Sequence, residues 1–181
     1  MRLLKSLFAS CLGGSEDPRG VTSPTETQHD SSRCKFCSAS PENGFDVVWE
    51  DESFTVFTDR DPAAAHHFLV IPKIHIDNVK SLTAKDAPMV SRMSEIGHRV
   101  LDDLKVPTTS QRLGFHIPPF FSVNHLHMHA QGLPYCSTAR ALKYRVSAGS
   151  GAHGKGFSWF CEADQAVRIL AKGGQIAVFP C

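Results

Sequence analysis

The feature that most restricts the fold of this chain is an alternation of histidines with apolar residues, His-Leu-His-Met-His, at positions 125–129. Successive side chains of a β-strand point to opposite faces, so His125, His127 and His129 would share one face at intervals of about 6.6 Å. The intervening leucine and methionine would point to the other face, into a core. The alternation therefore predicts a sheet with one face packed on a core and the other face carrying imidazoles.

Three imidazoles on one strand face also indicate a chemistry. The unperturbed pKa of imidazole is about 6.5, so at neutral pH much of it is an unprotonated nitrogen nucleophile. Attack on phosphorus would form a phosphoimidazole intermediate, while neighbouring imidazoles neutralise phosphate oxygens and protonate the leaving group. The alternative is a metal site, because two histidines on one strand face are also a common ligand pair.

The rest of the chain carries the signals of a small mixed fold. Runs with strand character occupy residues 45–50, 53–58, 66–71, 112–117 and 123–130. One long helix is predicted between Thr83 and about Lys105 by apolar residues at spacings of three and four, namely Met89, Met93, Ile96, Val100 and Leu104. A shorter helix is expected from Glu162 to about Lys172, closed by two glycines. Short connections around one long helix favour an α+β fold with an antiparallel sheet over a βαβ arrangement.

Composition divides the chain into three parts. Residues 13–33 are rich in Gly, Ser, Thr, Pro, Asp and Glu and contain almost nothing apolar, so residues 1–33 are expected to form a disordered N-terminal tail. The ordered domain should then cover residues 34–146. Residues 147–181 are expected to form a C-terminal extension with a Gly-rich loop and the short helix.

Charge and cysteine content narrow the classes of protein and of partner. With 19 basic and 18 acidic residues the net charge is +1, which gives no case for broad electrostatic capture of nucleic acid. No run approaches the roughly 18 apolar residues of a transmembrane helix, so no membrane partner is expected. The N-terminal apolar run is broken by Lys5 and does not resemble a secretory signal. The six cysteines should therefore be reduced. The expected location is the cytoplasm, with the nucleus as an alternative, and an N-terminal mitochondrial signal is a further alternative.

Three stretches resemble the histidine triad family. The histidines at 125–129, followed by Ala-Gln, match its pattern of histidines alternating with apolar residues, and residues 59–75 look like its second signature, ending in Val-Ile-Pro-Lys-Ile-His. Residues 112–129 are similar to the branch that holds the third histidine triad nucleotide-binding protein and aprataxin. The resemblance spans residues 34–145. It implies a five-stranded antiparallel sheet with one long helix, and a homodimer.

Carried over position by position, the resemblance implies a catalytic set. His127 would be the nucleophile, and His129 and His67 would accompany it on the phosphate side. Asp59 falls where the family grips the ribose hydroxyls with an acidic side chain, although a turn-capping aspartate is the alternative. No catalytic cofactor is implied.

Two further positions complete the implied nucleotide-binding set. Ser122, three residues before the triad, falls where a hydroxyl contacts the α-phosphate; the alternative is an ordinary loop hydroxyl. His116 occupies a position that is Asn in the best-known members, so the resemblance leaves its role open.

Cys34 and Cys37 form a Cys-x-x-Cys pair with two competing interpretations. A redox pair would need a thioredoxin-like βαβ context, which the chain lacks. Zinc-bearing members of the superfamily complete a tetrahedral site with two histidines, which correspond here to His75 and His125. A structural zinc that ties the lead-in segment to the sheet is therefore expected, with two free thiols as the alternative.

The resemblance implies hydrolysis at the α-phosphorus of an adenosine 5′-phosphoramidate or acyl-adenylate. His127 would attack, an amine or carboxylate would leave, and water would release AMP from the nucleotidyl-histidine. The rivals are an aprataxin-like remover of adenylate from DNA ends, a dinucleoside polyphosphate hydrolase, and a nucleotide-binding interaction module with vestigial activity. A nucleic-acid partner is not expected, because basic residues in the last third of the chain are scattered.

Overall fold

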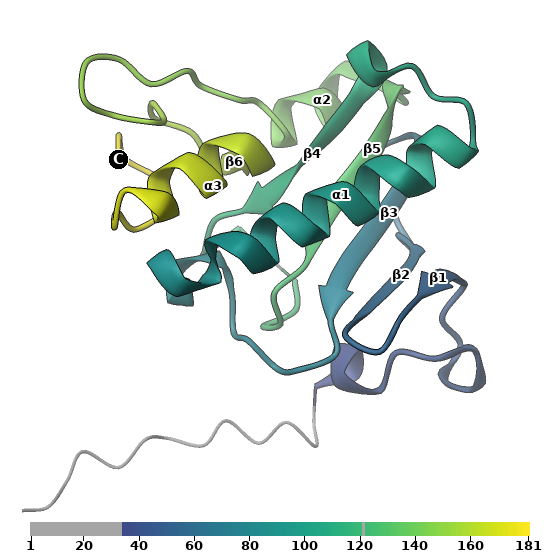
Figure 1. Ribbon diagram of the computed structural model, residues 1–181. Coiled ribbons are helices and arrows are strands. Elements are labelled where there is room, and N and C mark those ends of the chain that lie inside the picture. Colours follow the sequence, from purple (N-terminus) through teal and green to yellow (C-terminus); the bar gives the residue numbers. More distant parts are fainter. Residues whose placement is uncertain (1–33, 121) are drawn as a thin grey trace, which may run out of the picture.

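A computed structural model describes residues 34–120 and 122–181 (Figure 1). The predicted disordered tail, residues 1–33, lies outside the described residues. The strands are β1 (Val47–Glu50), β2 (Phe54–Thr58), β3 (Ala64–Pro72), β4 (Gln111–His116), β5 (Met128–Tyr135) and β6 (Phe160–Glu162). The α-helices are α1 (Ala87–Asp103), α2 (Thr138–Lys143) and α3 (Ala163–Ala171). Short 3₁₀ turns are η2 (Lys35–Ser38), η3 (Pro41–Asn43), η4 (Val79–Ser81), η5 (Ala84–Asp86) and η6 (Thr108–Ser110).

The strands form one antiparallel sheet in the order β1-β2-β3-β5-β4-β6 (Figure 1). This arrangement confirms the predicted α+β fold, with one long helix and a short C-terminal helix. The described residues contain six strands, one more than the five predicted, because the C-terminal extension adds β6 at the edge of β4. The extension is therefore part of the same sheet as the segment before it.

The added strand depends on a glycine in its neighbour. β6 pairs with β4 so that Gly114 lies opposite Glu162 and His116 lies opposite Phe160. A Cβ atom on Gly114 would lie 2.4 Å from the carbonyl oxygen of Cys161, so only glycine permits this approach. A strand of three residues is too short to show an alternation of polar and apolar side chains, which is why the sequence did not predict it.

The strand predicted for residues 123–130 begins later than expected. β5 starts at Met128, so His129 lies in the strand while His125 and His127 precede it in irregular backbone. The β3–β5 ladder reaches Val70 opposite Met128 and stops, and β3 ends two residues later at Pro72, which has no N–H to donate. The expected burial of the alternate residues is nevertheless confirmed, since Leu126 and Met128 both lie in the core.

The long helix starts with a capping arrangement. Thr83 and Asp86 form a capping box around η5, with the Thr83 N–H donating to the Asp86 carboxylate at 2.8 Å. Pro88 follows in the first turn of α1, where no backbone N–H is needed. In the predicted apolar stripe Met93, Ile96 and Val100 are buried and Met89 is half-buried. Leu104 lies beyond the last helical residue and is exposed. No helix in the described part of the chain is long and apolar enough to cross a membrane.

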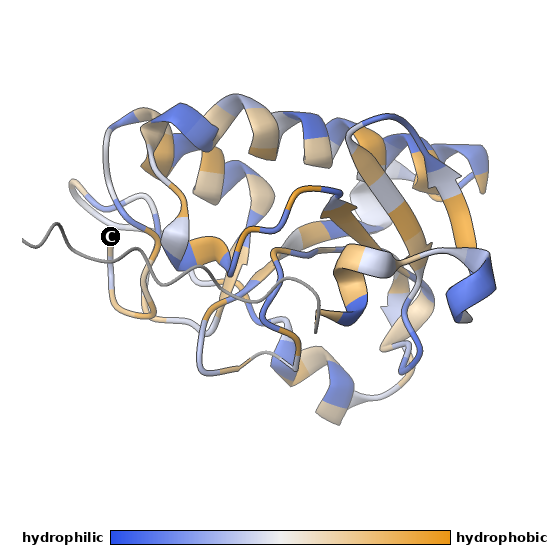
Figure 2. Ribbon diagram, turned by 90° about the horizontal axis from the view of Figure 1, so that it is seen from below, coloured by the Kyte–Doolittle hydropathy of each residue, from blue (hydrophilic) through white to orange (hydrophobic). Residues whose placement is uncertain are grey.

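The core lies between the sheet and the two helices α1 and α3, which cover one of its faces (Figures 1 and 2). Residues of the C-terminal extension, including Ile169 and Leu170, pack in the same core as Met93 and Phe115. Each such fully buried side chain contributes about 1.5–3 kcal/mol through removal of apolar surface from water. The imidazoles lie on the opposite face of the sheet, which α1 and α3 do not cover.

A buried lysine anchors the predicted Gly-rich loop. Lys155 is fully buried, and its ammonium donates to the carbonyl oxygens of Gly156, Ser158 and Val178 at 2.8, 3.0 and 3.2 Å. An ammonium has three N–H donors, so all of them are satisfied. The charge is therefore used to hold the C-terminal extension together and does not reach solvent.

Candidate functional site

His127 carries its proton on the nitrogen that faces the backbone. Its Nδ1 lies 2.6 Å from the carbonyl oxygen of His125, and a carbonyl only accepts, so Nδ1–H donates. Burial is the main reason why the pKa of His127 is lowered from its usual range, so the ring is neutral at neutral pH. A neutral imidazole has one proton, so Nε2 keeps a free lone pair. This is the protonation state that a nitrogen nucleophile requires.

His67 and His129 form a hydrogen-bonded pair beside it. The Ala63 N–H donates to His67 Nδ1 at 3.0 Å, which places the proton of His67 on Nε2. His67 Nε2–H then donates to His129 Nδ1 at 2.8 Å, so His129 carries its own proton on Nε2. We call His67, His127 and His129 the imidazole cluster; the rings of His127 and His129 are 5.3 Å apart.

The proton on His129 Nε2 is available to a ligand. His129 Nε2 is buried and has no hydrogen-bond partner among the described residues. A buried N–H without an acceptor costs about 1–3 kcal/mol, a cost that an anionic oxygen would remove. Burial lowers the pKa of His67 to about 4 and also lowers that of His129, so both rings are neutral donors at pH 7.

Asp59 lies at the edge of the imidazole cluster and serves two purposes. Its Oδ2 is 3.4 Å from His67 Nε2 and 3.8 Å from His129 Nδ1. Its Oδ1 accepts the backbone N–H of Asp61 at 2.9 Å, which is the turn-capping role given above as the alternative. The two interpretations of this residue are therefore compatible, and contact with ribose stays a prediction.

The two remaining predicted nucleotide contacts lie on the β4 side. His116 ends β4, its ring is 4.7 Å from that of His129, and its Nε2 bonds to the carbonyl of Lys143 at 3.0 Å. Burial lowers the pKa of His116. Ser122 is exposed in the segment between β4 and β5, and its contact with phosphate stays a prediction.

Two aromatic residues that the sequence interpretation missed enclose these histidines. The Tyr144 ring is buried and lies 4.8, 5.4 and 5.7 Å from the rings of His116, His129 and His67. It follows the six-residue helix α2, which is too short to show helical periodicity, so no sequence pattern pointed to it. The Phe36 ring lies 5.5 Å from the ring of His127, and its position between the two cysteines was the available signal.

The cysteines and the two remaining predicted ligands lie together. Cys34, Cys37, His75 and His125, the metal cluster, place their ligand atoms within 4.8 Å of one another. Cys37 Sγ is 3.2 Å from His75 Nδ1, and Cys34 Sγ is 3.4 Å from His125 Nδ1. Tetrahedral zinc with two sulfur and two nitrogen ligands requires a sulfur–nitrogen separation of roughly 3.6 Å. Small movements would therefore fit these residues around one metal ion.

The orientation of both imidazoles in the metal cluster also suits a metal. His125 Nε2–H donates to the carbonyl of Pro72 at 2.9 Å, and His75 Nε2–H donates to the carboxylate of Asp77 at 3.1 Å. Both protons are held away from the cysteines, so both Nδ1 lone pairs point to the centre of the cluster. Such outer partners fix the tautomer and ring orientation of metal-binding histidines.

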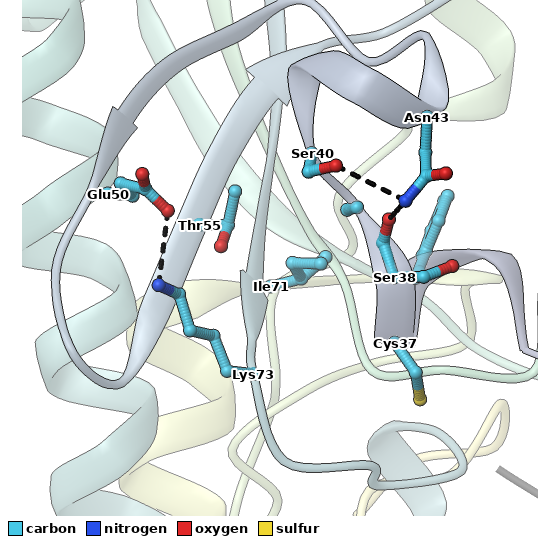
Figure 3. A pocket seen from close by; sticks show the side chains of 10 residues that line it. Cys37, Ser38, Ser40, Asn43, Glu50, Thr55, Ile71 and Lys73 are labelled. Carbon is cyan, nitrogen blue, oxygen red and sulfur yellow. Dashed lines mark hydrogen bonds and ion pairs between the residues drawn. The ribbon is translucent and has the colours of Figure 1, made fainter. Parts of the chain in front are cut away.

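A separate cavity lies beside this cluster. It has a volume of about 340 Å³ and is bounded by η2 and by strands β1 to β3 (Figure 3). Figure 3 shows Cys37 at its edge and an ion pair between Lys73 and Glu50, with Nζ and Oε2 3.1 Å apart. No member of the imidazole cluster lines it, so the cavity reaches the metal cluster through Cys37 and not the nucleophile.

Comparison with known proteins places this arrangement in a family. Residues 33–144 match the family described as scavenger mRNA decapping enzyme C-term binding. The chain is 36% identical over 145 residues to adenosine 5′-monophosphoramidase HINT3 of Danio rerio, which covers 77% of this chain and 83% of that protein. It is 26% identical over 134 residues to aprataxin of Gallus gallus, which covers 72% of this chain and 39% of aprataxin.

A solved structure shares the fold. A HIT family hydrolase from Clostridium thermocellum superimposes with a TM-score of 0.52 at 29% identity, covering 58% of this chain and 94% of that one. The bacterial hydrolase is thus almost wholly contained in this chain. The remaining part of this chain consists of segments that the smaller hydrolase does not match.

Proposed function

Because the chain belongs to the histidine triad superfamily and is a nucleotide hydrolase of adenosine 5′-monophosphoramidase type, we propose that it cleaves adenosine 5′-phosphoramidates or acyl-adenylates at the α-phosphorus. The proposal commits to AMP as one product and to an amine or a carboxylate as the other. The observation that carries it is the free Nε2 lone pair of His127, which is fixed by the Nδ1–H bond to the His125 carbonyl.

In the first step His127 Nε2 attacks the α-phosphorus. A nitrogen–phosphorus bond forms while the bond from phosphorus to the leaving nitrogen or oxygen breaks, which gives a nucleotidyl-histidine. A leaving amine takes up a proton, which a neighbouring imidazole of the cluster is suited to donate, whereas a carboxylate leaves as the anion. His129 Nε2–H, which has no acceptor among the described residues, would donate to a phosphate oxygen as negative charge accumulates there. Asp59 would hold the ribose hydroxyls, and Ser122 and His116 would lie on the phosphate side.

In the second step water attacks the same phosphorus. An oxygen–phosphorus bond forms, the bond to His127 Nε2 breaks, and AMP is released with the imidazole restored. The neutral rings of the cluster are suited to carry the proton that the water loses, because each has one protonated and one unprotonated nitrogen. The proposed steps use only side chains of this chain.

We also propose that the metal cluster holds a structural zinc ion. All four coordination positions would be protein ligands, so the ion would stabilise the link between the η2 segment and the sheet without offering an open site to substrate. His75 and His125 share the Nε2–H tautomer that leaves Nδ1 for a metal, which supports this assignment.

Two observations favour small conjugates over adenylated DNA. Gripping a DNA strand needs several free Lys or Arg side chains, each neutralising a phosphate. Arg140 is bonded to the carboxylate of Asp61 at 2.6 Å, and Lys155 is buried against three carbonyls. Two of the six basic residues that follow the triad are thus engaged within the protein.

The location and assembly remain proposals. We propose a cytoplasmic protein, with the nucleus as the alternative, that acts as a homodimer. Because β6 covers the edge of β4, a partner copy would have to dock on another surface of the described part.

Release of AMP by the purified protein tests the proposal. Adenosine 5′-phosphoramidate and an acyl-adenylate should both be hydrolysed, and the phosphoimidazole adduct should form on His127 alone. Adenylated DNA, compared at physiological salt, should be cleaved with a kcat/KM at least about tenfold lower. Absence of turnover would overturn the proposed function, and a preference for DNA would assign the chain an aprataxin-like role.

A further inference from the structure

Gln131 is a fully buried glutamine beside the imidazole cluster, and the proposed steps do not use it. It lies in β5, where it pairs with His67 of β3 on one side and with Arg112 of β4 on the other. Because it follows His129 by two residues, it faces the same side of the sheet as that histidine. A buried amide is costly unless its oxygen and its nitrogen both have partners, so this position needs an explanation.

The amide of Gln131 contacts a polar group at each end. Its nitrogen lies 3.3 Å from His67 Nε2, and its oxygen lies 3.3 Å from the Tyr135 hydroxyl. His67 Nε2 carries a proton, because Nδ1 accepts the Ala63 N–H, so two donors would face each other. Half a turn of the amide places the oxygen against His67 Nε2–H and the nitrogen against the hydroxyl. Both contacts are hydrogen bonds in this orientation only.

Three acceptors then surround the proton of His67 Nε2. They are His129 Nδ1 at 2.8 Å, the amide of Gln131 at 3.3 Å and Asp59 Oδ2 at 3.4 Å. The proposed function assigns Asp59 to the ribose hydroxyls, so a bound nucleotide would draw that carboxylate away from this proton. Gln131 is fully buried, so it has no access to substrate and keeps its contact with the ring.

The other end of the amide leads back to the same pair of histidines. The Tyr135 ring stacks on the Tyr144 ring, with the centroids 5.7 Å apart and the planes at 16°. The Tyr144 ring in turn packs edge-on against His67 and His129. The amide, the two tyrosines and the two histidines form a closed loop of contacts, so no member can rotate without disturbing the next.

Resting on the proposed function, we propose that Gln131 is a positioning residue for hydrolysis, whose amide oxygen accepts the His67 Nε2–H and holds that ring while Asp59 binds ribose. His67 then keeps donating to His129 Nδ1, and the His129 Nε2–H keeps pointing to the phosphate. Gln131 does not touch the substrate and takes no part in the bond-making steps. Its removal should therefore lower the rate of the chemical step and leave the affinity for the nucleotide unchanged.

The first test replaces Gln131 with leucine, which is similar in size and forms no side-chain hydrogen bonds. In Gln131→Leu the kcat for adenosine 5′-phosphoramidate should fall by about tenfold or more, because His129 is no longer held in place, while KM stays within about twofold. Tyr135→Phe removes only the outer partner of the amide and keeps the ring stack, so kcat should fall by about threefold. This second variant also serves if the leucine variant does not fold. An unchanged kcat in either variant would overturn the proposal.

Gln165→Leu is the matched control. Gln165 is the other buried glutamine of the described residues, and its amide is also bonded at both ends, to the Glu162 N–H at 3.2 Å and the Ser147 carbonyl at 2.9 Å. The same change there removes as many hydrogen bonds, but in α3 and outside the imidazole cluster, so kcat should stay within about twofold. An equal fall of kcat in both leucine variants would mean that the loss of any buried amide is enough, which would overturn the proposal.

A second measurement does not depend on turnover. NMR of the free protein and of its complex with AMP, a product that is not turned over, measures how fast the His67 Nε2–H exchanges with water. In the complex Gln131→Leu should raise this rate by at least about tenfold and Gln165→Leu by less than about twofold. In the free protein the effect of Gln131→Leu should be smaller, because Asp59 still accepts the proton.

The two measurements separate failure of the proposed function from failure of the positioning role. If the proposed function alone fails, hydrolysis is absent from every protein, while the His67 Nε2–H still exchanges faster in Gln131→Leu than in Gln165→Leu. Equal exchange rates in the two leucine variants would overturn the positioning role itself.

Discussion

The imidazole cluster and the metal cluster are neighbours and both contain histidines. They differ in whether the ring nitrogen that faces the centre of the cluster carries a proton. In the metal cluster the outer nitrogen of each histidine donates, to the Pro72 carbonyl or the Asp77 carboxylate, so both Nδ1 lone pairs converge on the cysteines. In the imidazole cluster His67 Nδ1 accepts the Ala63 N–H, so its inward Nε2 carries a proton. One arrangement presents lone pairs to a shared centre and the other presents a chain of N–H donors.

This difference decides which cluster suits a metal. Asp59, His67 and His129 also place their ligand atoms within 4.8 Å of one another, which by distance alone resembles a metal site. A metal ion at His67 Nε2 would displace that proton while the backbone N–H still occupies Nδ1, which would force the ring into the unfavourable anionic form. The comparison teaches that the hydrogen-bond partner of the second ring nitrogen, more than the spacing of ligands, separates a metal site from an acid–base site.

The largest expected effect breaks the imidazole cluster at its nucleophile. His127→Ala should lower the rate of AMP release by at least about a thousandfold, because no other side chain supplies the attacking nitrogen, while nucleotide affinity stays within about tenfold. Single-turnover kinetics and equilibrium binding measure the two quantities. His153→Ala, an exposed histidine outside both clusters, is the control and should behave as wild type. A His127→Ala rate above a few per cent of wild type would rule out this nucleophile.

A second prediction uses pH to sharpen the comparison. The pKa of His67 is about 4 in the folded chain and about 6.5 when unfolded, so between these values the unfolded chain binds more protons. Stability is therefore fully present above pH 6.5 and is lost as pH falls towards 4, by about 3 kcal/mol from this residue. Urea unfolding at pH 7, 6, 5 and 4 measures the loss. His67→Gln should lose less stability over that range, and an equal loss in both proteins would contradict the assignment.

A third prediction concerns the metal cluster alone. Zinc should copurify at one atom per chain, and Cys34→Ser/Cys37→Ser should lose it together with about 2 kcal/mol or more of stability. The free energy of unfolding should fall markedly while the rate constant of the chemical step changes little. The reason is that four protein ligands leave no open coordination position for substrate. Elemental analysis, thermal unfolding and single-turnover kinetics give the three readouts. Cys136→Ser, an exposed cysteine outside the cluster, is the control. Zinc retained by the double variant would contradict this prediction, and so would a second equivalent of metal bound at the imidazole cluster.

The smallest expected effect comes from deletion of the N-terminal residues, which lie outside the described part of the chain. Deletion of residues 1–32 should leave kcat/KM within about twofold and the zinc content unchanged, since the composition of this segment cannot support a packed core. Hydrolysis by the shortened chain is compared directly with that by the full chain. A loss of more than tenfold would mean that the segment contributes to the site.

Much of the fold followed from local patterns. The apolar stripe of α1 and the burial of Leu126 and Met128 both depend on residues close together in the chain, so the sequence alone predicted them. β6 and α2 were missed because three or six residues are too few to show a period. The start of β5 was misplaced because the end of its ladder depends on Pro72, more than fifty residues earlier.

The identity of the clustered residues was likewise contained in the sequence, through the alternating histidines, the Cys-x-x-Cys pair and the resemblance they carry. The tertiary structure alone decided how each ring is protonated. The partners that fix the tautomers include the carbonyl of Pro72 for His125 and the N–H of Ala63 for His67, which in turn orients His129 from a distant strand. A hydrogen bond fixes a proton only over about 3 Å, so which nitrogen attacks phosphorus and which binds metal is settled when folding brings those backbone groups together.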